Sequence, residues 1–150
     1  MALKLNKWDR RFLDMAQFVA SWSKDPSTKV GCVIASGNKV ISIGFNGYPH
    51  GLADTDDPRE LKYAKTIHAE VNAILHAKQD LTGCSIYITP LPPCSRCAAV
   101  IIQSGITKIY SRATDGDALN RWYKDFQLAA SMTAEAGIQT YSEINPCPLK

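Results

Sequence analysis

Two short motifs in this 150-residue chain carry side chains that could bind a metal ion. His68 offers an imidazole, Cys94 and Cys97 offer two thiols, and each motif stands where a helix is expected to begin. Such a set can hold one Zn²⁺ and leave the fourth tetrahedral position to water, which is typical of a catalytic zinc site. Glu70 lies two residues after the histidine, so it can approach the metal without ligating it and carry protons there. The spacing therefore predicts a catalytic zinc centre with Glu70 as its general acid and base.

Two other uses of the cysteines remain open. A structural zinc site would need a fourth protein ligand. The candidates for it are His50, His76, Cys32, Cys84 and Cys147. His76 is two helical turns from His68 and too far along the axis to share a metal with it, while Cys32 and Cys84 stand in apolar strand-like runs where free cysteines are usually core residues. The Cys-x-x-Cys pair could also be redox-active, but alone it is a weak signal, and five irregularly spaced cysteines do not indicate a disulfide framework.

Length and composition are those of one globular domain. The chain is 45% hydrophobic and 21% charged, with a net charge of +3, which excludes disordered and fibrous classes. That charge is too small for a protein built around a nucleic acid, although it allows a small anionic ligand. The apolar runs are too short for a membrane helix, and residues 1–11 carry charges where a signal peptide would be apolar. We expect one domain over residues 1–150, in the cytoplasm (the host cytoplasm for a viral source), with no membrane or nucleic-acid partner.

The hydrophobic pattern predicts four helices and five strands. The helices are expected at 8–23, 66–77, 95–104 and 120–136, and the strands at 29–36, 39–45, 85–89, 106–111 and 138–141. The first two strands should form a hairpin, and the later ones alternate with helices. This order predicts an α/β fold, a three-layer α/β/α sandwich with a mixed five-stranded sheet. Thr66 is the expected N-cap of the second helix, residues 46–65 a long functional loop, and residues 143–150, with Cys147, a flexible tail.

Several further segments resemble a known family. The pattern His-x-Glu followed by Pro-Cys-x-x-Cys is the general signature of zinc deaminases. Residues 21–34 (SWSKDPSTKVGCVI), 44–51 (GFNGYPHG), 68–75 (HAEVNAIL), 83–87 (GCSIY) and 97–106 (CAAVIIQSGI) make the chain similar to deoxycytidylate (dCMP) deaminases of the cytidine deaminase superfamily, nearly end to end. The resemblance implies a cytidine deaminase-like fold and zinc-dependent hydrolysis of dCMP to dUMP and ammonia, which supplies dUMP for thymidylate synthesis.

The resemblance also implies roles for single residues. Zinc would activate a water molecule for attack on C4 of the cytosine ring, while Glu70 moves protons to N3 and to the departing amine. Asn46 would contact the sugar, Val30 would line the base pocket, and the backbone N–H of Ala69 would bind the cytosine O2. A carbonyl between Pro90 and Pro92, with Pro92 as the implied residue, would accept the amine. The implied phosphate-binding residues are Tyr123, Arg121 and Lys29.

Regulation and assembly are implied in the same way. Members of the family are commonly homo-oligomers, often hexamers, activated by dCTP and inhibited by dTTP together with Mg²⁺. The glycine-rich loop is the implied effector site, because glycines let backbone N–H groups approach a triphosphate. The implied effector residues are Lys24, Asn46, Gly47, His50 and Gly51, and Asp54, Asp56 or Asp57 would help to hold Mg²⁺. No second, structural zinc is expected, because the long loop offers His50 alone.

Two segments depart from the family pattern. Residues 87–94 (YITPLPPC) are one residue longer than usual, and residues 111–124 match poorly.

Three rival functions are also compatible with the motifs. They are a tRNA adenosine deaminase, a deaminase of free cytidine, and a zinc-stabilised binding module without catalysis. A tRNA-binding protein should carry a basic C-terminal stripe, whereas acidic residues balance the basic ones in the last third of this chain. A binding module would have no use for the uncoordinated carboxylate of Glu70.

Overall fold

The computed structural model describes residues 3–146, which form six helices and five strands within that range. The helices are α1 (Lys7–Ala20), α2 (Arg59–Lys65), α3 (Ala69–Ala77), α4 (Ser95–Ser104), α5 (Asp117–Arg121) and α6 (Tyr123–Glu135). The strands are β1 (Gly31–Ser36), β2 (Lys39–Phe45), β3 (Ser85–Thr89), β4 (Lys108–Thr114) and β5 (Gln139–Asn145). Within the described residues, no helix is both long enough and apolar enough to cross a bilayer.

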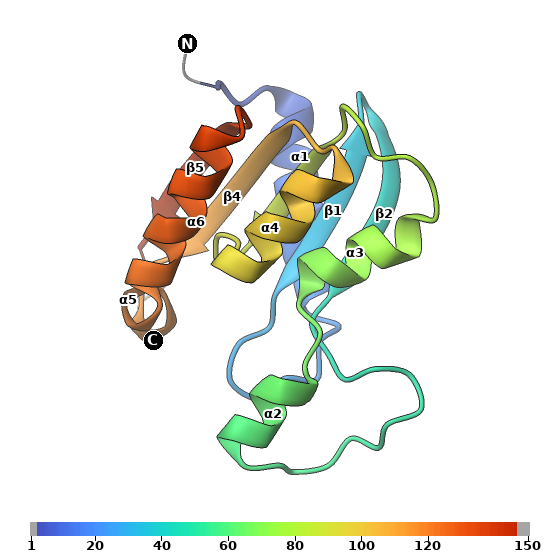
Figure 1. Cartoon of the computed structure of the whole chain (residues 1–150), viewed down its shortest axis with the longest axis vertical. Coiled ribbons are helices and arrows are strands. Elements are labelled where there is room, and N and C mark those ends of the chain that lie inside the picture. Colours follow the sequence, from blue (N-terminus) through green and yellow to red (C-terminus); the bar gives the residue numbers. More distant parts are fainter. Residues whose placement is uncertain (1–2, 147–150) are drawn as a thin grey trace.

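All five strands belong to one sheet with the order β2-β1-β3-β4-β5. β1 runs antiparallel to both of its neighbours, while β3, β4 and β5 run parallel to one another. The hairpin and the helical crossovers through α4 and α6 account for this mixture, because parallel neighbours need a crossover and antiparallel ones do not. Helix α1 covers one face of the sheet, and α3, α4 and α6 cover the other (Figure 1). The prediction of a three-layer sandwich with a mixed five-stranded sheet is confirmed.

The alternation of side chains along β1 divides the core between the two faces. Cys32 and Ile34 pack with α3 and α4, whereas Val33 and Ala35 pack with α1. Successive side chains of a strand point to opposite faces, and a strand covered on both sides is therefore apolar throughout. Cys32 is fully buried and Cys84 lies in the same cluster, so their prediction as core residues is confirmed.

A close approach of backbones seats the helix that begins at the candidate site. Gly44 of β2 lies so near α3 that a Cβ atom there would overlap the carbonyl oxygen of Ala69 and the amide nitrogen of Ala73. Both contacts are backbone atoms, so neither can move aside as a flexible side chain would. Glycine at this position is what allows β2 and α3 to pack together.

We expect Gly44→Ala to lower the free energy of unfolding by about 1–3 kcal/mol, because α3 and β2 must separate to admit the methyl group. Urea denaturation measures this effect. Gly47→Ala is the matched control, since a Cβ at Gly47 meets nothing within 4 Å. Equal denaturation midpoints for the two variants would contradict the packing argument.

The predicted element boundaries need correction in the middle of the chain. The expected loop of residues 46–65 contains α2, and Thr66 ends that helix instead of capping the next one, with its hydroxyl donating to the Lys62 carbonyl at 2.7 Å. His68 is the N-cap residue of α3, which begins at Ala69. No residue of α2 is buried, so the sequence has no apolar periodicity that would reveal the helix.

Further corrections concern both ends of the chain. The first helix ends at Ala20, three residues earlier than predicted. Phe18, within that helix, and Trp22, after it, are both exposed. The single helix predicted at 120–136 is two helices, α5 and α6, that meet at the non-helical residue Trp122. β5 pairs with β4 as far as Asn145, so residues 143–145 are strand and not tail. The prediction for Cys147 lies outside the described residues.

Candidate active site

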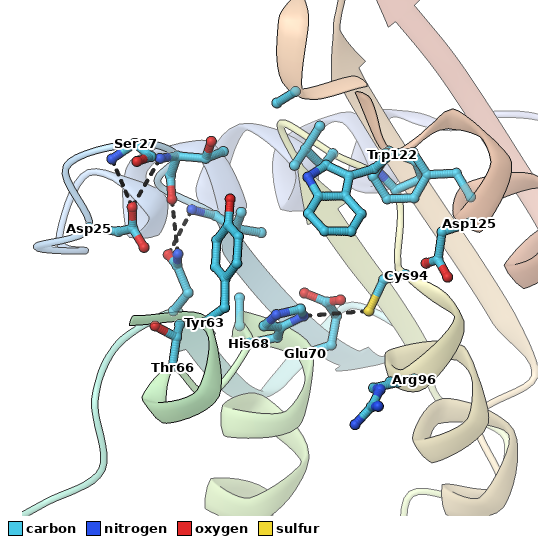
Figure 2. Close-up of a pocket in the computed structure, with 18 of the residues that line it drawn as sticks. Asp25, Ser27, Tyr63, Thr66, His68, Glu70, Cys94, Arg96, Trp122 and Asp125 are labelled. Atoms are coloured by element: carbon cyan, nitrogen blue, oxygen red, sulfur yellow. Dashed lines mark hydrogen bonds between the residues drawn. The ribbon is translucent and has the colours of Figure 1, made fainter. Parts of the chain in front are cut away.

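The three candidate zinc ligands come from the N-termini of two neighbouring helices. His68 is the N-cap residue of α3 and Cys94 that of α4, and Cys97 lies in the first turn of α4. Neither N-cap side chain makes a capping hydrogen bond to its own helix, so both are directed to the space between the helices. Figure 2 shows the His68 ring and the Cys94 sulfur pointing toward one another.

The spacing of the donor atoms fits a tetrahedral zinc ion. His68 Nδ1 lies 3.5 Å from Cys94 Sγ and 3.3 Å from Cys97 Sγ, and one ligand atom from each of the three residues lies within 4.8 Å of the other two. Zinc–ligand bonds of the usual lengths at tetrahedral angles would place nitrogen and sulfur about 3.6 Å apart. Within the described residues this is the one set of three or more such side chains that could hold a metal. One nitrogen and two sulfurs leave the fourth position open.

The three side chains differ in how readily they ionise, and the Cys94 thiol is the one whose ionisation suits a cation. The hydrogen bond from Cys97 lowers the pKa of Cys94 to about 4, and the bond with His68 acts in the same direction. The pKa of Cys97 is raised, because that thiol donates to Cys94 and is desolvated. Hydrogen bonding to Cys94 likewise raises the pKa of His68. Cys94 is thus the more readily ionised of the two thiols, and a bound zinc ion would favour the thiolate form of both.

Glu70 lies beside the cluster in the first turn of α3 and is 3% exposed. Burial raises the pKa of its carboxyl group above the ordinary value, although the positive charge of His68 and a hydrogen bond from Cys97 oppose the shift. A carboxyl group with a raised pKa exchanges protons more readily near neutral pH than an exposed glutamate does. Glu70 has the location and the environment of a proton carrier.

A cavity of about 310 Å³ opens directly onto the cluster. Its base consists of His68, Glu70 and Cys94, and its walls come from the loop before β1, from α2, and from the segment where α5 meets α6 (Figure 2). Tyr63 and Trp122 face each other across this space, with ring centroids 6.0 Å apart and nearly perpendicular planes. The cavity is large enough for a small organic molecule.

Most of the predicted substrate-binding residues lie on this cavity. The residues of that set that line it are Val30, Asn46, Ala69, Pro92 and Arg121. Lys29 is exposed and does not line it. Tyr123 lines a neighbouring cavity of about 220 Å³ between α6 and the sheet.

Asn46 ties two walls of the cavity together. Its side-chain oxygen accepts from the Val30 backbone N–H at 2.9 Å, and its side-chain nitrogen donates to the Thr28 carbonyl at 2.9 Å. The next residue, Gly47, forms an isolated β-bridge with Ile67, donating to the Ile67 carbonyl at 3.1 Å and accepting at 2.8 Å. Because Ile67 precedes His68, the glycine-rich loop is joined directly to the chain that carries the first candidate zinc ligand.

The other predicted effector residues lie outside the cavity. Exposed Lys24 pairs with Asp54 at 2.7 Å, and the His50 ring lies 6.4 Å from that of His76. Asp57 accepts from Tyr48, Thr55 and Lys65, and its pKa falls to about 2, mainly through the bonds from Thr55 and Lys65. Within the described residues, Asp54, Asp56 and Asp57 do not gather into a three-carboxylate metal site.

Several residues of the cavity were not predicted from the sequence. They include Asp25, Ser27, Lys62, Tyr63, Arg96, Trp122 and Asp125. Lys62 is 12% exposed and reaches Asp25 at 3.2 Å and the Ser27 hydroxyl at 2.9 Å. The run Pro58-Arg-Glu-Leu-Lys-Tyr-Ala-Lys has a proline at the start, an acidic first turn and a basic last turn, and these helix signals could have revealed α2.

A sheet flanked by helices, with a histidine and two cysteines at two helix N-termini beside an unligated glutamate, defines the zinc-dependent deaminase class. Residues 6–113 match the family model for the cytidine and deoxycytidylate deaminase zinc-binding region. The chain belongs to the cytidine and deoxycytidylate deaminase family. The predicted family resemblance and the prediction of a deaminase are confirmed.

Known relatives agree with this assignment. An uncharacterized deaminase in the luxG 3' region of Aliivibrio fischeri is 53% identical over 137 residues, which cover 90% of this chain and 92% of that protein. The human deoxycytidylate deaminase is 39% identical over 113 residues, 69% of this chain and 63% of the human one. The dCMP deaminase of cyanophage S-TIM5, solved with dCMP and dUMP, has the same fold, with a TM-score of 0.75 at 18% identity over 94% of this chain and all of that one. The match thus spans less than two thirds of the human enzyme.

Proposed function

We propose that this protein hydrolyses dCMP to dUMP and ammonia, supplying dUMP for thymidylate synthesis. The observation that carries the proposal is the His68, Cys94 and Cys97 cluster beside buried Glu70 at the base of an open cavity. The similarity to deoxycytidylate deaminases such as the human enzyme supports dCMP as the substrate, and so does the fold shared with a phage enzyme that binds dCMP and dUMP. The free cysteines Cys32, Cys84, Cys94 and Cys97 are consistent with a reducing, cytoplasmic location.

The proposed chemistry divides between the metal and the protein. Zinc, when bound, supplies a Lewis acid that makes water a nucleophile near neutral pH. Glu70 takes one proton from the attacking water and passes it to N3 of cytosine as the C4–O bond forms. It then moves the remaining proton of the new C4 hydroxyl to the amine, so that the C4–N bond breaks and ammonia leaves. The backbone N–H of Ala69, at the start of α3, is our donor to the cytosine O2. Pro92 offers a carbonyl to the amine, and Val30 and Asn46 hold the base and the sugar.

Recognition of the phosphate is assigned to the cationic part of the cavity. Arg121, Lys62 and Arg96 contribute positive charge from three separate elements, and a monophosphate needs such partners whereas a free nucleoside does not. Lys62 is oriented by its contacts with Asp25 and Ser27. Arg121 is our first choice, because it was predicted from the sequence and lines the cavity. Lys29 and Tyr123 stay predictions, as neither lines the cavity.

Regulation by dCTP and dTTP with Mg²⁺ is a further part of the proposal. It is supported by the β-bridge between Gly47 and Ile67, because a triphosphate bound to the glycine-rich loop would act on the chain segment that leads into His68. Lys24, His50 and Gly51 stay predictions for the same effector. Assembly into a homo-oligomer is supported by exposed Phe18 and Trp22, which continue to Phe45 as a run of edge-to-face aromatic rings at one edge of the sheet. A hexamer stays a prediction.

Release of ammonia from a panel of substrates tests the proposal. We expect the zinc-loaded protein to turn over dCMP at least tenfold faster, as kcat/KM, than deoxycytidine, which lacks the phosphate, because a charged phosphate contact contributes more than about 1.4 kcal/mol. CMP, dCTP and an adenosine-containing tRNA stem-loop complete the panel. Added dCTP should raise the rate at low dCMP, and dTTP with Mg²⁺ should lower it. Turnover of deoxycytidine or of the stem-loop alone would move the protein to another branch of the family. Saturation curves unchanged by both triphosphates would remove the regulatory part.

A further inference from the structure

Helix α4 carries two of the three candidate zinc ligands, yet its N-terminus has no cap of its own. Cys94 occupies the N-cap position and makes no capping hydrogen bond, because its sulfur lies 3.5 Å from His68 Nδ1. The first N–H groups of a helix have no partner within the helix, and a serine, threonine, aspartate or asparagine at the N-cap usually accepts from them. A cysteine that must face a metal cannot do so. The cap has to come from elsewhere in the protein.

A carboxylate from another helix takes that role. Asp125 of α6 accepts from the Ser95 backbone N–H at 2.9 Å and from the Ser95 hydroxyl at 2.7 Å, with one carboxylate oxygen for each bond. Ser95 is the first residue of α4 and directly follows Cys94. Two bonds to a charged acceptor are strong and fix the orientation of the first turn as well as its position. A negative group also suits the positive end of a helix. Figure 2 shows Asp125 beside Cys94.

The same carboxylate belongs to the segment that forms the upper wall of the cavity in Figure 2. Asp125 lies in the first turn of α6, and Trp122, the N-cap residue of that helix, lines the cavity with Arg121. The Trp122 carbonyl accepts from the Phe126 N–H at 3.0 Å, which holds this turn together. One side chain therefore connects the wall of the cavity with the helix turn that bears the two cysteines.

We propose that Asp125 is a positioning residue: through Ser95 it holds the first turn of α4 so that Cys94 and Cys97 meet a zinc ion in the required geometry. Asp125 is not itself a ligand. The inference rests on the proposed zinc-dependent function, but it concerns the binding of the metal and not the identity of the substrate. Its test is therefore a measurement of zinc affinity that needs no turnover.

Competition with a chromophoric zinc chelator, on the folded full-length protein, provides that test. We expect Asp125→Ala to weaken zinc binding about 10- to 100-fold, the range for the loss of groups that orient metal ligands. Asp125→Asn keeps an oxygen for the backbone N–H and an amide that can donate to the Ser95 hydroxyl, so it should restore most of the affinity. Ser95→Ala removes only the hydroxyl bond and should fall between the two. Glu135→Ala, which removes an exposed carboxylate from the same helix, should bind zinc as the wild type does.

Cobalt substitution supplies a readout that a general loss of stability would not change. The visible absorption bands of a Co²⁺–thiolate site report on the angles between its ligands, and we expect them to shift in Asp125→Ala and to stay in place in Glu135→Ala. A folded Asp125→Ala protein with wild-type zinc affinity and wild-type cobalt bands would overturn the proposal. Should that variant not fold, Ser95→Ala decides, and wild-type affinity and bands for it would also overturn the proposal. A graded loss of affinity in a protein that does not deaminate dCMP would support the positioning role while rejecting the proposed substrate.

Discussion

Glu70→Gln should bind zinc and fold as the wild type does and yet lose turnover of dCMP by roughly 10²- to 10⁴-fold, the usual contribution of general acid–base catalysis. The amide has the shape of the carboxyl group and fits the same buried position beside Cys97, but it cannot take a proton from water. The loss should appear in kcat rather than in KM, because the cavity that holds the nucleotide is unchanged. Steady-state kinetics and metal analysis of the same preparation measure both effects.

Glu60→Gln is the matched control, because it makes the same chemical change at an exposed position of α2, and it should retain its activity. A Glu70→Gln protein that keeps its zinc and works within a factor of about three of the wild type would remove Glu70 from the proposed chemistry. A variant that has lost its zinc would instead show that Glu70 supports the metal site, which the present geometry does not predict.

Cys97→Ala should lose both zinc and activity. Its sulfur is one of three donors around the site. A catalytic zinc site needs three protein ligands, and only His68 and Cys94 would remain. We expect the measured zinc content to fall from one ion per chain to almost none, and the rate of ammonia release to fall with it. Since Cys97 is 2% exposed, the substitution also leaves a small cavity, so the loss of metal must be separated from a loss of folding.

Cys84→Ala makes that separation. Cys84 is similarly buried, at 4% exposed, and lies in the core cluster outside the candidate zinc site. Its replacement should cost similar stability and leave zinc in place. Full zinc occupancy in folded Cys97→Ala would exclude Cys97 from the ligand set, and loss of zinc from Cys84→Ala would show that core packing and not ligation controls the metal content.

The two halves of the candidate zinc site could be predicted from sequence because the geometry of each is local. A ligand at a helix start has its position fixed by the turn that follows it, and both motifs stand at such starts. The meeting of the two starts could be predicted only because His-x-Glu followed by Pro-Cys-x-x-Cys is a known signature, since His68 and Cys94 are 26 residues apart. The sheet was predictable for a different reason. The short hairpin turn and the strand–helix–strand crossovers each allow few arrangements.

The far walls of the cavity could not be predicted because they depend on long-range pairing. Lys62 meets Asp25 across 37 positions of sequence, and no spacing rule connects the two. The phosphate-binding prediction met another difficulty. The prediction assumed one unbroken helix over residues 120–136. The chain instead leaves helical geometry at Trp122, with φ −102° and ψ 12°. On either side of this break, Trp122 lines the candidate site and Tyr123 lines the neighbouring cavity.

The environment of Asn46 has a consequence for the chemical ageing of the protein. Asn-Gly is the dipeptide most prone to deamidation of its own asparagine, in which the glycine amide nitrogen attacks the side-chain carbonyl to form a succinimide. Here that nitrogen is engaged by the Ile67 carbonyl, and the Asn46 side chain is held at both ends by Val30 and Thr28. In the folded chain both reacting groups are therefore held in hydrogen bonds to other residues. Isoaspartate at residue 46 would accumulate only in molecules whose glycine-rich loop has opened, so it would serve as a chemical record of that opening in stored protein.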